Sequence, residues 1–264
     1  MRLHVETAGH GPALVLLHGF TGNAGTWLPL LPVLAEHFRV LAVDLPGHRY
    51  SPPPDGMRLP ELADALVGIL DRLGIARAHW LGYSMGGRAA LHVALARPGR
   101  VERLILESAS PGIADATART LRAVADDALA ATLLRDGLPA FVDAWAAQPL
   151  FATQARLPGG VRERERAVRL GNGATGLAAA LRAFGPGVQA PLWDELAHLR
   201  PPTLLVVGAD DPPYRVLAAR MAARLPDAET VVVPDAGHAT HLENPVAFAA
   251  ATIDFLRRRA PRPA

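Results

Sequence analysis

The pentapeptide Gly82-Tyr83-Ser84-Met85-Gly86 constrains the fold of this chain more than any other feature of its sequence. It follows an apolar run at His79–Leu81 and opens a helical pattern at Gly86–Arg97. Small residues let a chain turn sharply from a strand into a helix, and a serine at the apex is held outward in a strained backbone conformation. An ordinary strand–helix turn is the alternative, but this context favours an outward-pointing, reactive Ser84.

Short apolar runs alternate with helical patterns along most of the chain. Strands are expected at Ala13–Leu17, Val40–Val43, His79–Leu81, Val101–Leu106, Thr203–Val207 and Thr230–Val233. Helices are expected at Glu61–Leu73, Gly86–Arg97, Tyr214–Leu225 and Pro245–Arg258. Buried strands that alternate with helices predict an α/β fold with a mostly parallel central sheet flanked by helices, and ligands then bind beyond the carboxyl ends of the strands.

The stretch from Pro111 to about Pro191 breaks this alternation. It is rich in Ala and Arg and contains no convincing strand. We therefore expect a helical lid at residues 111–191, inserted over the carboxyl edge of a core made of residues 1–110 and 192–264. A chain of 264 residues suits one such core with a modest insertion.

A serine hydroxyl is a poor nucleophile and a poor base unless a histidine takes its proton and an acid orients that histidine. In a serine-elbow fold the chain order is serine, acid, histidine. His238 follows the last expected strand, and both Asp210 and Asp211 follow Thr203–Val207. We prefer Asp211 as the orienting acid, because the G-x-x-D spacing after that strand is usual. Asp210 is then a helix cap or part of a turn.

Two backbone N–H groups are expected to stabilise developing negative charge near Ser84. One belongs to Met85, the residue after the serine, and the other to Phe20 in the early loop His18-Gly19-Phe20. We expect His18 to have a structural role in shaping this loop.

Composition excludes several classes of function. The chain has no Cys, which rules out disulfides, thiolate catalysis and Cys-based zinc sites. All 27 basic residues are Arg and the net charge is only +2, and the one basic run, Arg257-Arg258-Arg259, is interpreted as a solvated helix end. We therefore expect no nucleic-acid partner. The N-terminus lacks a signal-peptide pattern and no apolar run has membrane-spanning length, so a cytoplasmic protein without a membrane partner is expected, as a monomer or small homo-oligomer.

Arginines near the predicted site suggest an anionic ligand. Arg88 lies four residues after Ser84, where a cation opposes the dipole of the following helix. Such a placement beside a reactive serine hints at a bound anion, with an arginine turned toward solvent as the alternative. Most arginines of the insertion are expected on solvated faces, and Trp145 and Trp193 either line the pocket or anchor the lid.

The chain resembles the 2-succinyl-6-hydroxy-2,4-cyclohexadiene-1-carboxylate synthase family of menaquinone biosynthesis, within the α/β-hydrolase superfamily. The likeness runs almost from end to end. LHGF and G-x-S-x-G are common to the superfamily, whereas the GGR after the serine, the W-x-x-Q-P-L-F segment and the ESASPG turn are more specific. The matching stretches are LHGFTG at 17–22, DLPGH at 44–48, GYSMGGR at 82–88, ESASPG at 107–112, FVDAWAAQPLF at 141–151, RLGNGATGLAAALR at 169–182, the segment at 189–196 and AGHATHLENP at 236–245.

This resemblance implies an α/β-hydrolase fold that carries a lyase. The enzyme would eliminate pyruvate from a small anionic cyclohexene that bears an enolpyruvyl ether, a carboxylate and a succinyl chain, and it would need no metal or redox cofactor. Three carboxylates in that substrate would explain arginines around an otherwise apolar pocket. The matched motifs carry over Ser84, Asp211 and His238 as the catalytic triad. Four residues would contact the substrate, namely Arg88, Arg122 (with Arg119 as the alternative), Trp145 and Arg169.

Two other functions fit the same motifs. The first is a serine hydrolase of esters or carbon–carbon bonds on the same triad, because fold alone does not fix the reaction. The second is a non-catalytic ligand-binding protein on a hydrolase scaffold.

Overall fold

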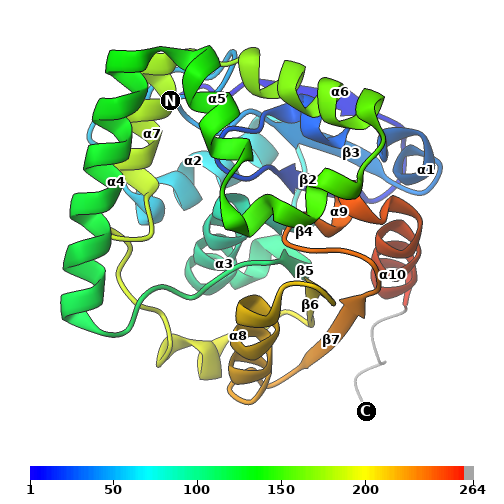
Figure 1. Cartoon of the computed structure of the whole chain (residues 1–264). Helices are drawn as coiled ribbons and strands as arrows, with labels where there is room; N and C mark the ends of the chain where they lie inside the picture. The colour runs from blue at the N-terminus through cyan, green and yellow to red at the C-terminus, as the bar shows by residue number, and fades with distance from the viewer. Residues whose placement is uncertain (259–264) are drawn as a thin grey trace.

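A computed structural model describes residues 1–258, and its centre is a seven-stranded sheet (Figure 1). The strand order is β1-β3-β2-β4-β5-β6-β7, and β1 is antiparallel to β3 whereas the six others pair in parallel. The α/β prediction with a mostly parallel sheet is confirmed. The strands are β1 (Val5–Ala8), β2 (Ala13–Leu17), β3 (Arg39–Val43), β4 (Ala78–Tyr83), β5 (Val101–Glu107), β6 (Thr203–Gly208) and β7 (Ala228–Val233).

Helices cover both faces of the sheet because alternate residues of its central strands are apolar on both sides. Val15 and Leu17 of β2 pack in the cluster that contains α2, α3 and α8. Leu14 and Leu16 pack in the cluster that contains α1 and α10. The helices of the core are α1 (Leu31–Ala35), α2 (Leu59–Arg72), α3 (Met85–Ala96), α8 (Pro212–Ala222), α9 (Thr240–Glu243) and α10 (Pro245–Arg257).

The segment between β5 and β6 consists of helices. Leu133, Phe141, Leu177 and Leu181 give it a small apolar core of its own. It also approaches the core domain very closely, because a Cβ on Gly47 would lie 2.3 Å from the backbone oxygen of Gly176. Figure 1 shows these helices as a layer that wraps one side of the sheet, away from β7. They are α4 (Ala116–Asp136), α5 (Leu138–Ala146), the 3-10 segment η3 (Pro149–Arg156), α6 (Gly159–Leu170) and α7 (Ala174–Phe184).

Two features of the sheet differ from the sequence predictions. Strand β1 was not predicted, because its four residues form no apolar run and are at most partly buried. Thr230–Val233 lies in a strand, but the prediction that this strand is buried is wrong. Strand β7 pairs only with β6 at the edge of the sheet, and Val232 is 44% exposed. An edge strand with a solvated side can carry the same β-branched residues as a central one.

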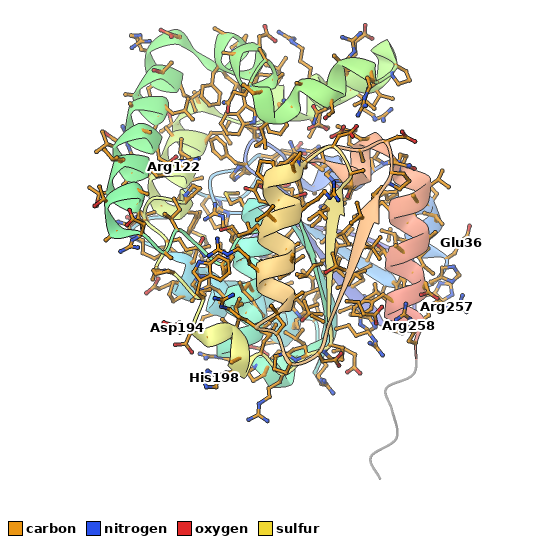
Figure 2. All side chains as sticks on the ribbon, turned by 60° about the horizontal axis from the view of Figure 1, so that its bottom comes forward. Glu36, Arg122, Asp194, His198, Arg257 and Arg258 are labelled. Carbon is orange, nitrogen blue, oxygen red and sulfur yellow. The ribbon has the colours of Figure 1, made fainter. Side chains whose placement is uncertain are left out.

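The basic run at the chain end lies at the exposed end of α10, where Figure 2 labels Arg257 and Arg258. Arg258 is paired with Glu229 and Asp254. Arg259 lies outside the described residues. Within residues 1–258, no helix combines the length and the apolar character needed to cross a bilayer.

Buried histidines predict that the fold loses stability in mild acid. Burial lowers the pKa of His48, His79 and His92 from 6.5 to about 4. Between pH 6.5 and pH 4 these histidines are neutral in the folded protein but protonated in the unfolded chain, so unfolding takes up protons. The free energy of unfolding is therefore at its full value above pH 6.5 and falls as the pH drops toward 4. Each histidine should lower the free energy of unfolding by about 2 kcal/mol at pH 5. Urea unfolding at pH 8 and pH 5 measures the loss. It should be smaller in His79→Phe, and an equal loss would contradict this origin.

Candidate active site

Ser84 occupies a sharp turn between β4 and α3. Its φ is 51°, a conformation that non-glycine residues rarely adopt. Neighbouring glycines make the turn possible by close backbone approach. A Cβ on Gly86 would lie 2.2 Å from the backbone oxygen of Leu17, and a Cβ on Gly82 would lie 2.4 Å from that of Gly86. The G-x-S-x-G spacing is therefore a packing requirement, and it projects Ser84 from the carboxyl end of β4.

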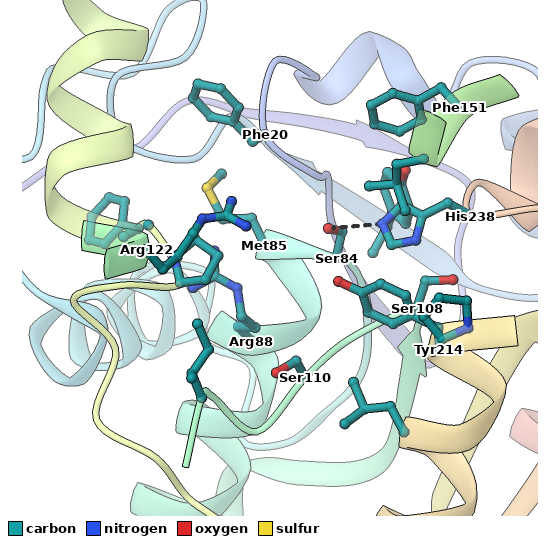
Figure 3. A pocket seen from close by; sticks show the side chains of 18 of the residues that line it. Phe20, Ser84, Met85, Arg88, Ser108, Ser110, Arg122, Phe151, Tyr214 and His238 are labelled. Carbon is teal, nitrogen blue, oxygen red and sulfur yellow. Dashed lines mark hydrogen bonds between the residues drawn. The ribbon is translucent and has the colours of Figure 1, made fainter. Parts of the chain in front are cut away.

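Ser84, His238 and Asp211 lie in one hydrogen-bonded row. His238 Nε2 is 3.3 Å from Ser84 Oγ, and His238 Nδ1 is 2.9 Å from Asp211 Oδ2 (Figure 3 shows the Ser84–His238 pair). The imidazole and the carboxylate are both buried. The buried carboxylate orients the ring so that Nε2 faces the hydroxyl, which is the arrangement needed to draw a proton from Ser84.

The two candidate aspartates have different partners. Asp211 caps α8, where its Oδ1 accepts a hydrogen bond from the Tyr214 N–H at 3.4 Å, while its other oxygen faces His238. Asp210 pairs with Arg156 of η3 at 2.6 Å and is 41% exposed. The geometry therefore supports the preference for Asp211, and Asp210 instead ties η3 to the core.

Glu243 holds the loop that carries His238. Its two carboxylate oxygens accept hydrogen bonds from the N–H groups of Gly237, at 2.9 Å, and Ala239, at 3.1 Å. These two residues flank His238 directly. Sequence reasoning gave Glu243 no role, although its position five residues after the histidine is part of the AGHATHLENP stretch.

The two predicted N–H donors lie beside the serine. Phe20 and Met85 line the same cavity as Ser84, and a Cβ on Gly19 would be 3.5 Å from Ser84 Cβ. Within residues 1–258, neither the Phe20 N–H nor the Met85 N–H has a hydrogen-bond acceptor. His18 shapes this loop as expected. Its Nε2 accepts a hydrogen bond from Leu45 N–H at 3.0 Å, which leaves Nδ1 to donate to the Gly19 carbonyl at 2.8 Å.

Ser84 opens into a cavity of about 370 Å³ between the sheet and the helical insertion. Three arginines, Arg88, Arg122 and Arg220, contribute to its wall (Figure 3 labels the first two). The described residues that line this cavity include no Asp or Glu. The rest of the wall is mostly apolar and aromatic, so the cavity suits a small ligand that carries several negative charges.

Arg88 is a buried cation at the base of this cavity. Its side chain donates a hydrogen bond to Gln189 Oε1 at 3.0 Å, and no carboxylate of residues 1–258 lies within 4 Å of it. Burial lowers the pKa of Arg88 to about 10, so it is still charged at neutral pH. The solvent-facing alternative does not fit this position. A buried charge without a counter-ion indicates that a ligand supplies one.

The structure separates the two lid arginines that the sequence could not rank. Arg122 lines the cavity from α4 and is oriented by Asp126, whose carboxylate lies 2.7 Å from Arg122 Nε. Arg119 instead donates to the backbone carbonyls of Ile113 and Ala114, at 2.8 and 3.2 Å, and does not line the cavity.

The two remaining predicted contact residues have different surroundings. Trp145 lines the cavity and packs against Phe20, with 5.1 Å between ring centroids. Arg169 does not line it. Its guanidinium is buried behind Phe151, 5.5 Å from that ring centroid, and is paired with Glu165 at 3.1 Å. The structure therefore brings Trp145 to Ser84 but not Arg169.

Sequence reasoning did not select several residues of the cavity wall. Ser108 and Ser110 follow the carboxyl end of β5, and Tyr214 and Arg220 project from α8. The Tyr214 ring lies 4.5 Å from the His238 ring, centroid to centroid. The carboxyl end of β5 was a usable signal for the two serines, because ligand sites gather at that edge. No comparable signal in the sequence marked Arg220.

Known proteins with similar sequences identify the family to which this architecture belongs. A family model described as the alpha/beta hydrolase fold matches residues 12–245. A Bacillus subtilis protein, named as a candidate 2-succinyl-6-hydroxy-2,4-cyclohexadiene-1-carboxylate synthase, is 38% identical over 94% of this chain and 93% of its own length. The synthase of that name from Serratia proteamaculans is 34% identical over 93% of both chains.

A solved structure agrees with the sequence relatives. The structure of MenH from S. aureus superposes with a TM-score of 0.91, at 31% identity, and the match covers 97% of each chain. The extent of these matches confirms the resemblance drawn from the motifs. The chain thus belongs to the α/β-hydrolase-fold family and, within it, to the 2-succinyl-6-hydroxy-2,4-cyclohexadiene-1-carboxylate synthase family.

Proposed function

We propose that this protein is a carbon–oxygen lyase of menaquinone biosynthesis. It eliminates pyruvate from 2-succinyl-5-enolpyruvyl-6-hydroxy-3-cyclohexene-1-carboxylate and leaves 2-succinyl-6-hydroxy-2,4-cyclohexadiene-1-carboxylate. One observation carries this proposal beyond the family likeness: the buried Arg88, in a cavity shared with Ser84, has no carboxylate partner in the part of the chain that the structure describes. The proposed substrate has three carboxylates, whereas simple esters would leave that buried charge without a counter-ion.

In this reaction Ser84 acts as the base and His238 receives its proton. The serine oxygen removes the ring proton next to the succinyl ketone, and the electron pair of that C–H bond is held as an enolate on the succinyl carbonyl oxygen. When the enolate collapses, this pair forms a new ring double bond. The existing double bond shifts by one position, and the bond to the enolpyruvyl oxygen breaks. The released enolpyruvate takes up a proton and becomes pyruvate. Asp211 keeps the His238 ring oriented throughout.

The Phe20 and Met85 N–H groups stabilise the enolate that forms on the succinyl carbonyl oxygen. Arg88 and Arg122 bind carboxylates, and Trp145 provides an apolar wall. Arg169 supports that wall through Phe151, since its own charge is already paired.

We assign the groups of the site to two parts of the chain, a core and a lid. The core that holds Ser84, Asp211 and His238 is assigned to residues 1–110 and 192–264, of which 259–264 lie outside the described residues. Residues 111–191 are assigned to a lid that adds Arg122 and Trp145. One chain supplies all of these groups, so a monomer is sufficient and a small homo-oligomer is compatible. Because the proposed substrate is a small, water-soluble trianion, we place the reaction in the cytoplasm.

The test is pyruvate release from the enolpyruvyl substrate, followed by coupled oxidation of NADH with lactate dehydrogenase. We expect turnover at enzyme concentrations far below that of the substrate, with a rate well above the enzyme-free reaction. A rate no faster than the enzyme-free control would contradict the lyase proposal.

The same three residues also support ester hydrolysis, and a second assay separates the two functions. Turnover of p-nitrophenyl butyrate should be slow, because a neutral ester leaves Arg88 without an anion. Rapid ester turnover together with an absence of pyruvate release would favour a serine hydrolase instead.

A further inference from the structure

Arg220 is the third arginine of the cavity, and its charge has no carboxylate partner among residues 1–258. It lies on α8 and lines the cavity with Tyr214 and Leu217 of the same helix. In the described part of the chain, no carboxylate lies within 4 Å of its guanidinium, whereas Arg122 on the opposite element α4 is paired with Asp126. Unlike the buried Arg88, Arg220 is exposed, so its guanidinium is accessible to an anion that enters the cavity.

An aromatic ring holds the Arg220 side chain in place. Its guanidinium carbon lies 4.5 Å from the ring centroid of Trp193. That ring is itself fixed, because the Trp193 indole N–H donates to the Gly112 carbonyl at 3.0 Å. Stacking on an aromatic face engages the flat side of a guanidinium and leaves its N–H edge free to bind a carboxylate. Trp193 is partly buried against the apolar core, which further fixes this ring.

Arg224 provides an internal comparison. Its guanidinium carbon is 5.3 Å from the same Trp193 ring, and it donates a hydrogen bond to the Arg220 carbonyl at 3.0 Å. Arg224 does not line the cavity. The two residues thus share charge and aromatic neighbour. They differ in access to the cavity, because Arg220 lies on α8 whereas Arg224 lies in the turn that follows the end of that helix.

We propose that Arg220, held on Trp193, forms a third anion-binding subsite that determines specificity for a substrate with three carboxylates. Arg88, Arg122 and Arg220 reach the cavity from three elements, α3, α4 and α8, so each can bind a different carboxylate. The identity of that substrate rests on the proposed function, but the anion subsite does not require the lyase reaction.

The experiment compares Arg220→Met with the matched control Arg224→Met. Steady-state pyruvate release should show a KM about tenfold higher in Arg220→Met, with a smaller change in kcat, because a uniform binding contact is lost. Arg224→Met should remain within about twofold of the wild type. The difference between the variants should shrink at high salt, since the lost interaction is electrostatic. Arg220→Lys should recover part of the affinity.

A binding arm separates failure of the subsite from failure of the proposed function. Isothermal titration with tricarballylate, which has three carboxylates and no leaving group, should show about tenfold weaker binding in Arg220→Met and unchanged binding in Arg224→Met. If Arg220→Met binds tricarballylate more weakly but the wild type releases no pyruvate, the lyase proposal is refuted and the anion-binding subsite is supported. Three results overturn the subsite: wild-type affinity in Arg220→Met, equal losses in both variants, or no tricarballylate binding by the wild type.

Discussion

Replacing Ser84 with alanine is expected to lower kcat for pyruvate release by about a thousandfold or more. The hydroxyl is the one group between His238 and the substrate, and His238 Nε2 already lies 3.3 Å from it. Removing the hydroxyl leaves the imidazole too far away to take the ring proton directly. The Phe20 and Met85 N–H groups remain, so a small residual rate above the uncatalysed reaction is expected. Stopped-flow and steady-state assays of pyruvate release measure the change.

Substrate binding serves as the control for Ser84→Ala. The variant should bind tricarballylate as the wild type does, because Arg88, Arg122 and Arg220 are untouched. It should also fold as stably, since alanine relieves neither the positive φ at this position nor the contacts of its glycine neighbours. A variant that kept full pyruvate release would refute catalysis by this triad. If the wild type bound tricarballylate but turned over neither the enolpyruvyl substrate nor p-nitrophenyl butyrate, the protein would instead be a non-catalytic binding protein.

The sequence was sufficient to predict the sharp turn at Ser84, because the glycines that it requires stand at a fixed spacing. Gly82 packs against the backbone of Gly86, and Gly86 packs against the backbone of Leu17 on the neighbouring strand β2. Asp211 and His238 each follow a strand of the parallel sheet, β6 and β7. Because the carboxyl ends of parallel strands meet at one edge of the sheet, both residues are expected near Ser84. The G-x-x-D spacing favoured Asp211 over Asp210, and the turn geometry gives the physical reason: the Asp211 carboxylate faces His238, whereas that of Asp210 pairs with Arg156.

The lid side of the pocket was much less predictable. Arg119 and Arg122 lie within one turn of α4, and the direction of each depends on how α4 packs on α7 and on the buried Asp126. Arg169 belongs to a matched motif, yet Glu165 one turn before it pairs with its charge. Arg220 is one of two arginines on α8, and it differs from Arg215 in lining the cavity and in lying over Trp193. The pairs Arg122–Asp126 and Arg169–Glu165 are local, but which arginine reaches the cavity depends on packing between segments far apart in sequence, which residue periodicity does not encode.

Arg88→Met is expected to raise KM for the proposed substrate on the order of a hundredfold, because a buried charge-assisted contact to a carboxylate contributes about 2 to 4 kcal/mol to binding. The same change should increase the stability of the free protein. Burial lowers the pKa of Arg88 to about 10, and the cation sits in the first turn of α3 against the helix dipole. The folded protein therefore holds a charge that water would solvate better.

Removing that charge should raise the free energy of unfolding by roughly 1 to 3 kcal/mol, after the lost hydrogen bond to Gln189 is allowed for. Urea unfolding of Arg88→Met and wild type, each with and without tricarballylate, measures both effects: the variant should be the more stable protein alone and should gain less from the anion. Arg88→Lys, which keeps a charge but not the planar fork, should recover little affinity. Lower stability together with an unchanged KM would mean that Arg88 serves the fold and not the ligand. Arg88→Met is thus expected to lose substrate affinity and to gain stability. Both effects have one cause: the site keeps an uncompensated cation so that an anionic substrate can neutralise it.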